Sequence, residues 1–267
     1  MRNCFLFSDL IVKTAIRDKL LHAIAAVGVL LVVLIPLVSL FSMRQVQELA
    51  IAIATSASSF ILLIVTLLLG SSSVWRDIER KYTHSLLGMP FSRTSYLLGK
   101  YIGSAAVVSG IALLLGGVSL IAIKIAAAQY KSDLPLLWGT VITAMFYDTL
   151  KNLLLLAVAF FFSALSTSYY FSFFVTIAIY MAGTATQDVY EYMSGSYGNN
   201  FSPSLHTITK ALYFLLPNLQ AFNLKVYAIY SLPLNLGGLC LTFLYFIIYT
   251  GIILMLSSWA FSRRELM

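Results

Sequence analysis

Apolar residues dominate the chain in long runs, and polar residues gather between those runs. A helix needs roughly 20 apolar residues to cross the hydrocarbon core of a bilayer, and six runs come close to or exceed that length. We place the membrane-spanning helices at residues 23–42, 51–74, 101–123, 144–165, 170–187 and 236–260. The pattern therefore predicts an all-α integral membrane protein in which residues 1–267 form a single transmembrane domain.

Composition excludes the soluble classes of protein. Hydrophobic residues make up 60% of the chain and charged residues only 10%, whereas a soluble domain carries about 25% charged residues. The net charge of +7 does not indicate nucleic-acid binding. Basic residues stand at the ends of the apolar runs, and they form no stripe interleaved with aromatic residues.

The distribution of lysine and arginine predicts the orientation. Eleven of the 17 basic residues fall on the side of the two termini, five fall on the other side, and Lys151 lies within a span. Cytoplasmic segments of membrane proteins carry the excess of basic residues. We therefore expect a multi-pass protein of the inner (plasma) membrane with both termini in the cytoplasm.

Two segments outside the spans have a predicted structure. Residues 1–22 are expected to form an interfacial helix, because Asp9, Lys13 and Arg17 recur every four residues and form one polar row. An ordinary solvated helix or a disordered tail is the alternative. Residues 188–235 form the longest polar excursion on the other side and are expected to be an outer loop with short helices.

The longest strongly charged connector is residues 75–100, called the coupling segment below. The second span is expected to continue into it as a helix, and Gly88-Met89-Pro90 is a helix-ending signal. Ser92 is placed to cap a second helix that leads into the third span. A helix, a sharp stop and a second helix make a compact protrusion able to transmit force. A solvated connector is the alternative reading.

Asp148 and Lys151 are the notable ionisable residues within a predicted span. They stand three apart, so their side chains can face each other on a helix. An ionisable group inside a membrane is a candidate functional group. The pair either belongs to a translocation pathway or is a self-neutralised pair kept for packing.

Small residues predict places where helices approach closely. Gly99 and Gly103 are four apart at the start of the third span, and Gly116-Gly117 lies further along it. Glycine lets the backbones of membrane helices come together. We expect these positions to serve packing rather than transport.

The signatures of several enzyme classes are missing from the sequence. It contains neither G-x-x-x-x-G-K-[ST], which cradles nucleotide phosphates, nor H-E-x-x-H, and its histidines (His22, His84 and His206) are scattered. The sequence therefore predicts a non-catalytic protein with no resident cofactor or metal site.

Three patches resemble the membrane-spanning permease subunits of type-2 ABC exporters. The first corresponds to the first cytoplasmic loop of that family and consists of Ile78-Glu79-Arg80, Leu86-Leu87, Pro90, Ser92-Arg93 and Leu98-Gly99-Lys100-Tyr101. The other two correspond to the outer segment before the last span and to the C-terminal end: Leu216-Pro217-Asn218-Leu219 with Phe222-Asn223-Leu224, and Phe261 with Arg263-Arg264-Glu265-Leu266. The resemblance covers the whole chain. One departure is Lys81-Tyr82, where many relatives carry Gly-Thr.

The resemblance implies a fold, a function and a set of partners. The fold is six transmembrane helices preceded by an interfacial elbow helix. The function is export through a permease dimer, formed with an identical or a related chain, in which separate ATP-binding subunits hold ATP and Mg²⁺ and hydrolyse the ATP. No nucleic acid is expected among the partners, and membrane lipid surrounds the dimer. The residues implied in ATPase coupling are Asp77, Glu79, Arg80, His84, Pro90 and Arg93. A self-contained secondary transporter or channel is the alternative.

Overall fold

The computed structural model describes residues 2–42, 45–79, 93–129, 132, 134–166, 168–195 and 202–263. Every regular element within those ranges is helical, which confirms the predicted all-α class. The elements are α1 (Arg2–Arg17), α2 (Lys19–Val33), α3 (Ile35–Ser39), α4 (Val46–Glu79), α6 (Arg93–Gln129), α7 (Trp138–Leu165), α8 (Tyr169–Ser194), α9 (Pro203–Leu215), the 3-10 turn η2 (Gln220–Phe222), α10 (Lys225–Ile229) and α11 (Leu236–Arg263).

Six helical stretches are long and apolar enough to cross a membrane, in agreement with the predicted number. They are Leu21–Ser39, Val46–Ser73, Arg93–Gln129, Trp138–Leu165, Tyr169–Ser194 and Leu236–Arg263. The first is interrupted at Leu34, between α2 and α3. Pro36 causes the interruption, since a proline has no N–H to donate and its ring clashes with the carbonyl four residues before it.

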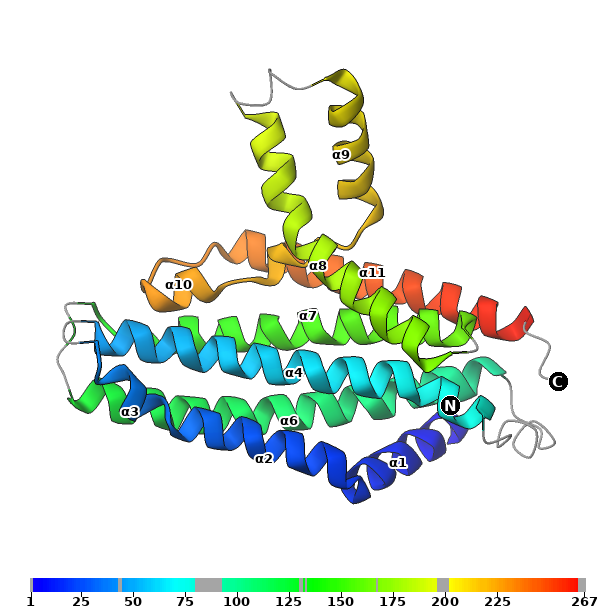
Figure 1. Cartoon of the computed structure of the whole chain (residues 1–267), viewed down its shortest axis with the longest axis horizontal. Coiled ribbons are helices and arrows are strands. Elements are labelled where there is room, and N and C mark those ends of the chain that lie inside the picture. Colours follow the sequence, from blue (N-terminus) through cyan, green and yellow to red (C-terminus); the bar gives the residue numbers. More distant parts are fainter. Residues whose placement is uncertain are drawn as a thin grey trace.

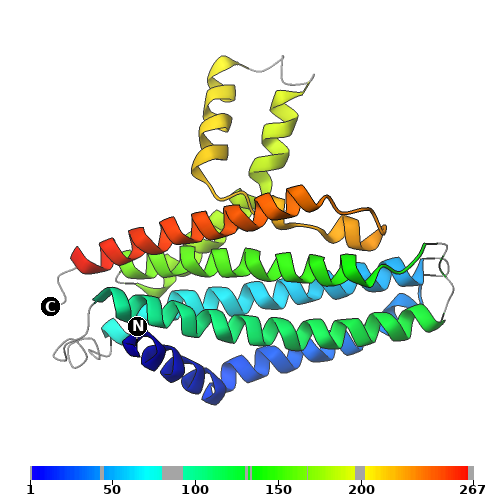
Figure 2. The ribbon, with the colours of Figure 1, turned by 180° about the vertical axis from the view of Figure 1, so that it is seen from behind.

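The long helices form one bundle, with the two termini at the same end (Figure 1). α4 packs against both α6 and α7, while α2 lies against α4 and α6, and α11 covers α7 (Figures 1 and 2). α4 ends and α6 begins at the end of the bundle where the N-terminus lies. The end of α4 and the start of α6, which flank residues 80–92, therefore lie at the same end of the bundle as the start of α1 and the end of α11.

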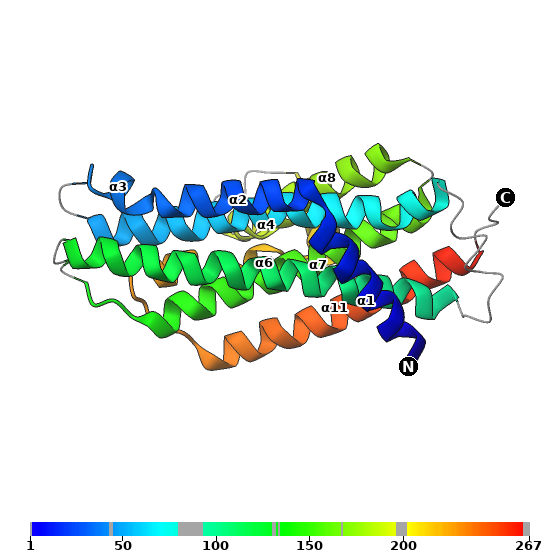
Figure 3. The same cartoon turned by 90° about the horizontal axis from the view of Figure 1, so that it is seen from below.

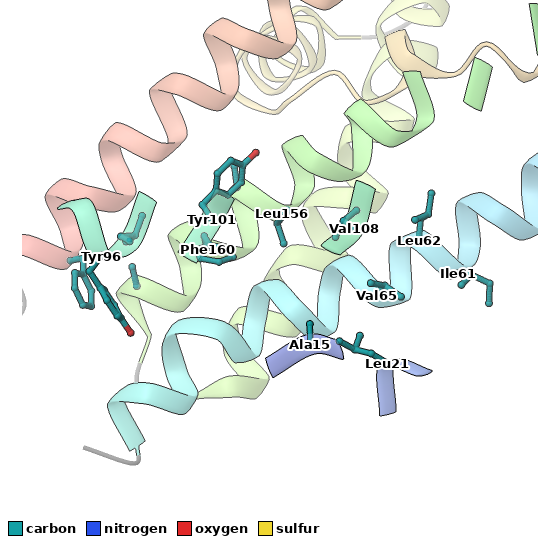
Figure 4. Packing of buried hydrophobic residues seen from close by; sticks show 14 of the residues in the cluster. Ala15, Leu21, Ile61, Leu62, Val65, Tyr96, Tyr101, Val108, Leu156 and Phe160 are labelled. Atoms are coloured by element: carbon teal, nitrogen blue, oxygen red, sulfur yellow. The ribbon is translucent and has the colours of Figure 1, made fainter. Parts of the chain in front are cut away.

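The centre of the bundle is packed with aliphatic and aromatic side chains from α4, α6 and α7. Val65, Val108 and Leu156 are buried in one cluster, and the rings of Tyr101 and Phe160 meet edge to face at 5.8 Å (Figure 4). A Cβ atom on Gly70 would lie 2.4 Å from the Cβ of Ala159. Glycine at this position therefore sets how closely α4 and α7 approach.

A separate helix precedes the first membrane-spanning helix. α1 crosses beneath α6, and the chain changes direction at Asp18 to enter α2 (Figure 3). A Cβ atom on Gly103 would lie 2.8 Å from the Cβ of Ile11, so the predicted close approach at Gly103 is confirmed. The location of α1 at a membrane interface stays a prediction.

The other predicted close approach, at Gly116-Gly117, is wrong. A Cβ atom on Gly117 would meet nothing within 4 Å, and one on Gly116 would meet only the Met145 sulfur, at 3.8 Å. These two glycines do not face a closely packed helix, although their neighbours Leu115 and Ser119 on α6 contact α2 and α4. Their positions in the sequence give no sign of this difference from Gly103.

A helical hairpin projects sideways from the bundle (Figures 1 and 2). It consists of the second half of α8 and the antiparallel α9, which are held together by Tyr190 stacked on Tyr213 with ring centroids 4.4 Å apart. At the base of the hairpin, the Leu219 N–H donates to the Gly183 carbonyl at 3.0 Å. The stretch 188–235 thus contains the end of α8, then α9, η2 and α10.

Candidate functional site

Of the predicted coupling residues, Asp77, Glu79 and Arg93 lie in described helices, at the end of the bundle where α4 ends and α6 begins. Asp77 and Glu79 belong to the last turn of α4, although their side chains lie outside the described part. Arg80, His84 and Pro90 lie outside the described residues altogether. Arg93 is the first residue of α6.

Arg93 connects the start of α6 to the end of α11. Its Nη1 donates to the Ser262 carbonyl at 2.9 Å, and one turn away the Ser258 hydroxyl donates to Thr94 Oγ1 at 3.0 Å. The ring of Tyr96 stacks on Phe261 with centroids 5.8 Å apart. The first and the third patch that resemble the permease family are therefore in direct contact, although Arg93 and Ser262 lie 169 residues apart in the chain.

Lys100 connects the start of α6 to the end of α4. Its side chain is buried, with 5% exposed, and its Nζ donates to the Ser73 carbonyl. The ammonium also lies 5.3 Å from the centre of the Tyr96 ring, a favourable cation–π distance. The two helices that flank the undescribed residues 80–92 are thus fixed to each other by a charged hydrogen bond.

Asp148 and Lys151 form a buried ion pair in the middle of α7. Lys151 Nζ lies 2.5 Å from Asp148 Oδ1, and the side chains are only 8% and 13% exposed respectively. Asn152 donates through Nδ2 to the Asp148 carbonyl at 2.8 Å. The spacing of three residues correctly predicts that the two side chains meet. Their part in transport stays a prediction.

A third ionisable residue, which the sequence reasoning did not single out, lies next to the pair. α10 packs on α4 and α7, and Lys225 at its start lines a cavity of about 20 Å³ together with Asp148, Ser59 and Thr149. A cavity of that size holds about one water molecule. Burial lowers the pKa of the Lys225 amine, and Lys151 adds to this effect, while the Asp148 carboxylate opposes it.

We call Asp148, Lys151 and Lys225 the Asp148 cluster. It contains two cationic side chains and one carboxylate, so it has a surplus of one positive charge. The Ser59 hydroxyl beside it is buried and has no hydrogen-bond partner among the described residues. In the sequence, Lys225 is recognisable only as a basic residue directly after the Phe222-Asn223-Leu224 run. That position does not predict that α10 packs back onto the bundle.

Hydrogen bonds of Asn218, in the patch before the last span, hold α10 in this position. The Asn218 N–H donates to the Tyr245 hydroxyl at 2.9 Å, its Nδ2 donates to Gln187 Oε1 at 3.1 Å, and its Oδ1 accepts the Ala221 N–H at 3.2 Å. Leu219 and Phe222 are fully buried. The patch therefore joins α8, η2 and α11, and it places α10 over the Asp148 cluster.

Across the described residues, no group of three or more histidine, cysteine, aspartate or glutamate side chains is arranged to hold a metal ion. Comparison with models of known protein families finds no match, and no curated protein matches the chain. The case for a function therefore depends on the geometry of the coupling end and of the Asp148 cluster.

Proposed function

We propose that the chain is the permease subunit of an ATP-driven ABC exporter. It works as a dimer with an identical or a related chain, in the inner (plasma) membrane with both termini in the cytoplasm. Separate subunits bind ATP and Mg²⁺ and hydrolyse the ATP, and the permease forms the pathway. The six apolar helices support a membrane protein, and the resemblance of the three sequence patches supports the exporter class.

The observation that carries the proposal is that the two helices flanking the coupling segment, α4 and α6, are long and are hydrogen-bonded to each other. At about 1.5 Å per residue, the 34 residues of α4 extend over about 51 Å and the 37 residues of α6 over about 55 Å. The hydrocarbon core of a bilayer is only about 30 Å thick. Both helices are therefore long enough to continue past the membrane.

A push on the coupling segment reaches the bundle through these helices. Lys100 holds the ends of α4 and α6 together, so the two helices move as a pair. The close contact of Gly70 with Ala159 passes the movement of α4 to α7, which carries Asp148 and Lys151. The charges of Glu79, Arg80 and Arg93 orient the ATP-binding subunit, since charges at an interface contribute more to orientation and association rate than to affinity.

The Asp148 cluster favours a second candidate, a secondary transporter or channel that works alone. Proteins of this class often carry ionisable groups in the middle of the membrane, close to their binding sites. Such a protein would move its solute without a nucleotide-binding partner. The purification described next distinguishes this candidate from the ABC exporter.

The test is to purify the full-length chain from its own cells and to identify and assay what binds to it. We expect a soluble nucleotide-binding protein to copurify and its ATPase rate to rise in the presence of the chain. Glu79→Gln and Arg93→Gln should lower that stimulation several-fold while leaving membrane insertion intact. Lys124→Gln, at the opposite end of α6, is the matched control and should behave like the wild type. Wild-type stimulation in both coupling variants would remove the role assigned to these residues, and transport by the chain alone would favour the second candidate.

A further inference from the structure

A cavity with a partly polar lining lies between α1, α4 and α6, next to the point where the membrane-spanning part of α4 ends at Ser73. Its volume is about 110 Å³. One buried water needs roughly 10–15 Å³, so the cavity has room for a tetrahedral oxyanion. We call it the α1–α4–α6 cavity. Its polar lining comes from Thr14, Asp18, Ser72, Ser73, Arg76, Lys100 and Ser104.

The lining of this cavity suits an anion. Arg76 and Lys100 are cationic and Asp18 is the one carboxylate, which leaves a surplus of one positive charge. Lys100 is nine-tenths buried, and a cation in such a place is stabilised by an anionic hydrogen-bond acceptor.

Two hydroxyl groups in the cavity point to the same kind of ligand. Ser104 is 1% exposed, and neither its Oγ nor that of Ser73 has a hydrogen-bond partner in the part of the chain that the structure describes. A buried hydroxyl is nearly always hydrogen-bonded, because leaving it unpaired costs about 1–3 kcal/mol. Both serines line the cavity, so each hydroxyl, once turned toward it, can donate to an oxyanion that lies near the two cations.

An apolar groove adjoins the cavity. It has a volume of about 340 Å³ and is lined by residues of α1, α2 and α6, and Ala15 and Leu21 border both spaces. Figure 3 shows how these three helices lie, and Figure 4 shows Ala15 and Leu21. The walls of the groove on α6 include Val107, Gly110 and Ile111. A Cβ atom on Gly110 would meet nothing within 4 Å, so the groove is open at this position. Because α2 and α6 are membrane-spanning helices, an acyl chain is the apolar molecule that reaches this groove.

We propose that the α1–α4–α6 cavity binds the phosphate group of an anionic phospholipid and that the groove holds one of its acyl chains. The surplus positive charge matches the single negative charge of a phosphatidylglycerol headgroup and disfavours the extra cation of phosphatidylcholine. The phosphate contacts Arg76, Lys100 and the two serine hydroxyls. This lipid fixes α1 to α4 and α6, and its binding does not depend on which transport class the protein belongs to.

The binding test uses the full-length chain, stripped of lipid in detergent and studied by native mass spectrometry. Phosphatidylglycerol, phosphatidylcholine and inorganic phosphate are titrated separately. We expect one phosphatidylglycerol per chain, bound about tenfold more tightly than phosphatidylcholine (about 1.4 kcal/mol). Equal affinity for the two lipids would overturn the headgroup assignment. Inorganic phosphate binding as tightly as phosphatidylglycerol would overturn the assignment to a lipid.

Variants of the cavity test the headgroup contacts. Arg76→Gln should remove the preference for phosphatidylglycerol, and Ser104→Ala should weaken its binding several-fold. Ser104→Ala should not lower the melting temperature of the lipid-free protein, because it removes an unpaired buried hydroxyl. Ser257→Ala removes another buried hydroxyl that has no hydrogen-bond partner among the described residues and lies outside the cavity, and it should leave lipid binding unchanged. Wild-type lipid binding in both cavity variants would reject the site.

Variants of the groove test the acyl chain independently. Gly110→Leu fills the groove and should weaken phosphatidylglycerol and phosphatidylcholine alike. Gly117→Leu adds the same side chain to α6 outside the groove, again with nothing within 4 Å of its Cβ, and should bind both lipids like the wild type. Equal affinities in the two glycine variants would place the acyl chain elsewhere and overturn this part of the proposal.

Discussion

At the scale of single residues, the charges inside this bundle are held by near neighbours. The Asp148 carboxylate forms an ion pair with Lys151, at 2.5 Å, and it also interacts electrostatically with Lys225 on α10. Lys100 is held by the Ser73 carbonyl and the Tyr96 ring. Each of these charges is buried, so its removal affects stability through the partner that it leaves behind.

We expect the two halves of the Asp148 cluster to respond unequally to mutation. Breaking a buried ion pair by removing one partner costs roughly 3–5 kcal/mol. Asp148→Asn leaves two cations without a carboxylate and should cost this much. Lys151→Met leaves Asp148 with Lys225 beside it and should cost clearly less. Melting temperatures of the purified variants in detergent measure the difference, and equal losses would contradict a contribution from Lys225.

The Lys225 amine should also give stability a dependence on pH. Its pKa in the folded protein lies below the ordinary lysine value of 10.5, chiefly because the amine is buried. Between the folded and the unfolded pKa the unfolded chain binds more protons, so stability rises as the pH rises through that range. The difference in melting temperature between wild type and Lys225→Met should shift in favour of the wild type as the pH approaches 10.5. A difference that is constant over the alkaline range would show that Lys225 does not titrate in this way.

At the scale of elements, the contacts between helices depend on a few glycines. Gly70 on α4 faces Ala159 on α7, and Gly103 on α6 lies against Ser8 and Ile11 of α1. Helices in a membrane associate through close packing rather than through a hydrophobic driving force. The pairing of α4 with α7 therefore depends on the missing side chain at Gly70.

Replacing Gly70 by alanine should separate α4 from α7. The new Cβ would lie 2.4 Å from the Cβ of Ala159, so the helices must move apart, at a cost of about 1–3 kcal/mol for overpacking. Gly117→Ala adds the same methyl group to α6 in open space and should not lower stability. Thermal unfolding of the two variants in the same detergent provides the comparison. Equal melting temperatures would contradict the tight contact.

The sequence predicted the six spans and the all-α class because membrane helices are long and apolar. It began the second span at residue 51, whereas α4 begins at Val46, because the first turn of α4 contains polar residues with partners far along the chain. Glu48 in the first turn of α4 accepts the Ser132 hydroxyl, and Gln47 donates to the Leu134 carbonyl at 3.3 Å. Local periodicity cannot reveal such partners. The sequence analysis predicted the Asp148–Lys151 pair because both residues lie on one helix. It missed Lys225 because that residue comes from another helix.

At the scale of the whole molecule, two regions of the bundle matter for the proposed function. One end brings together both termini, the end of α4 and the start of α6, and Arg93 and Lys100 fasten it to α11 and α4 (Figure 1). Near the middle of α7, the Asp148 cluster lies under α10. In our account the first region receives a push from an ATP-binding subunit, and the long helices carry it to the second.

Crosslinking from the coupling end tests this account most directly. A photoreactive benzoyl-phenylalanine is placed at Arg93, or at Lys124 at the far end of α6 as a control, and intact cells are irradiated. We predict that position 93 yields an adduct with a nucleotide-binding protein, whereas position 124 does not. No such adduct from position 93, or adducts of equal yield from both positions, would contradict the account.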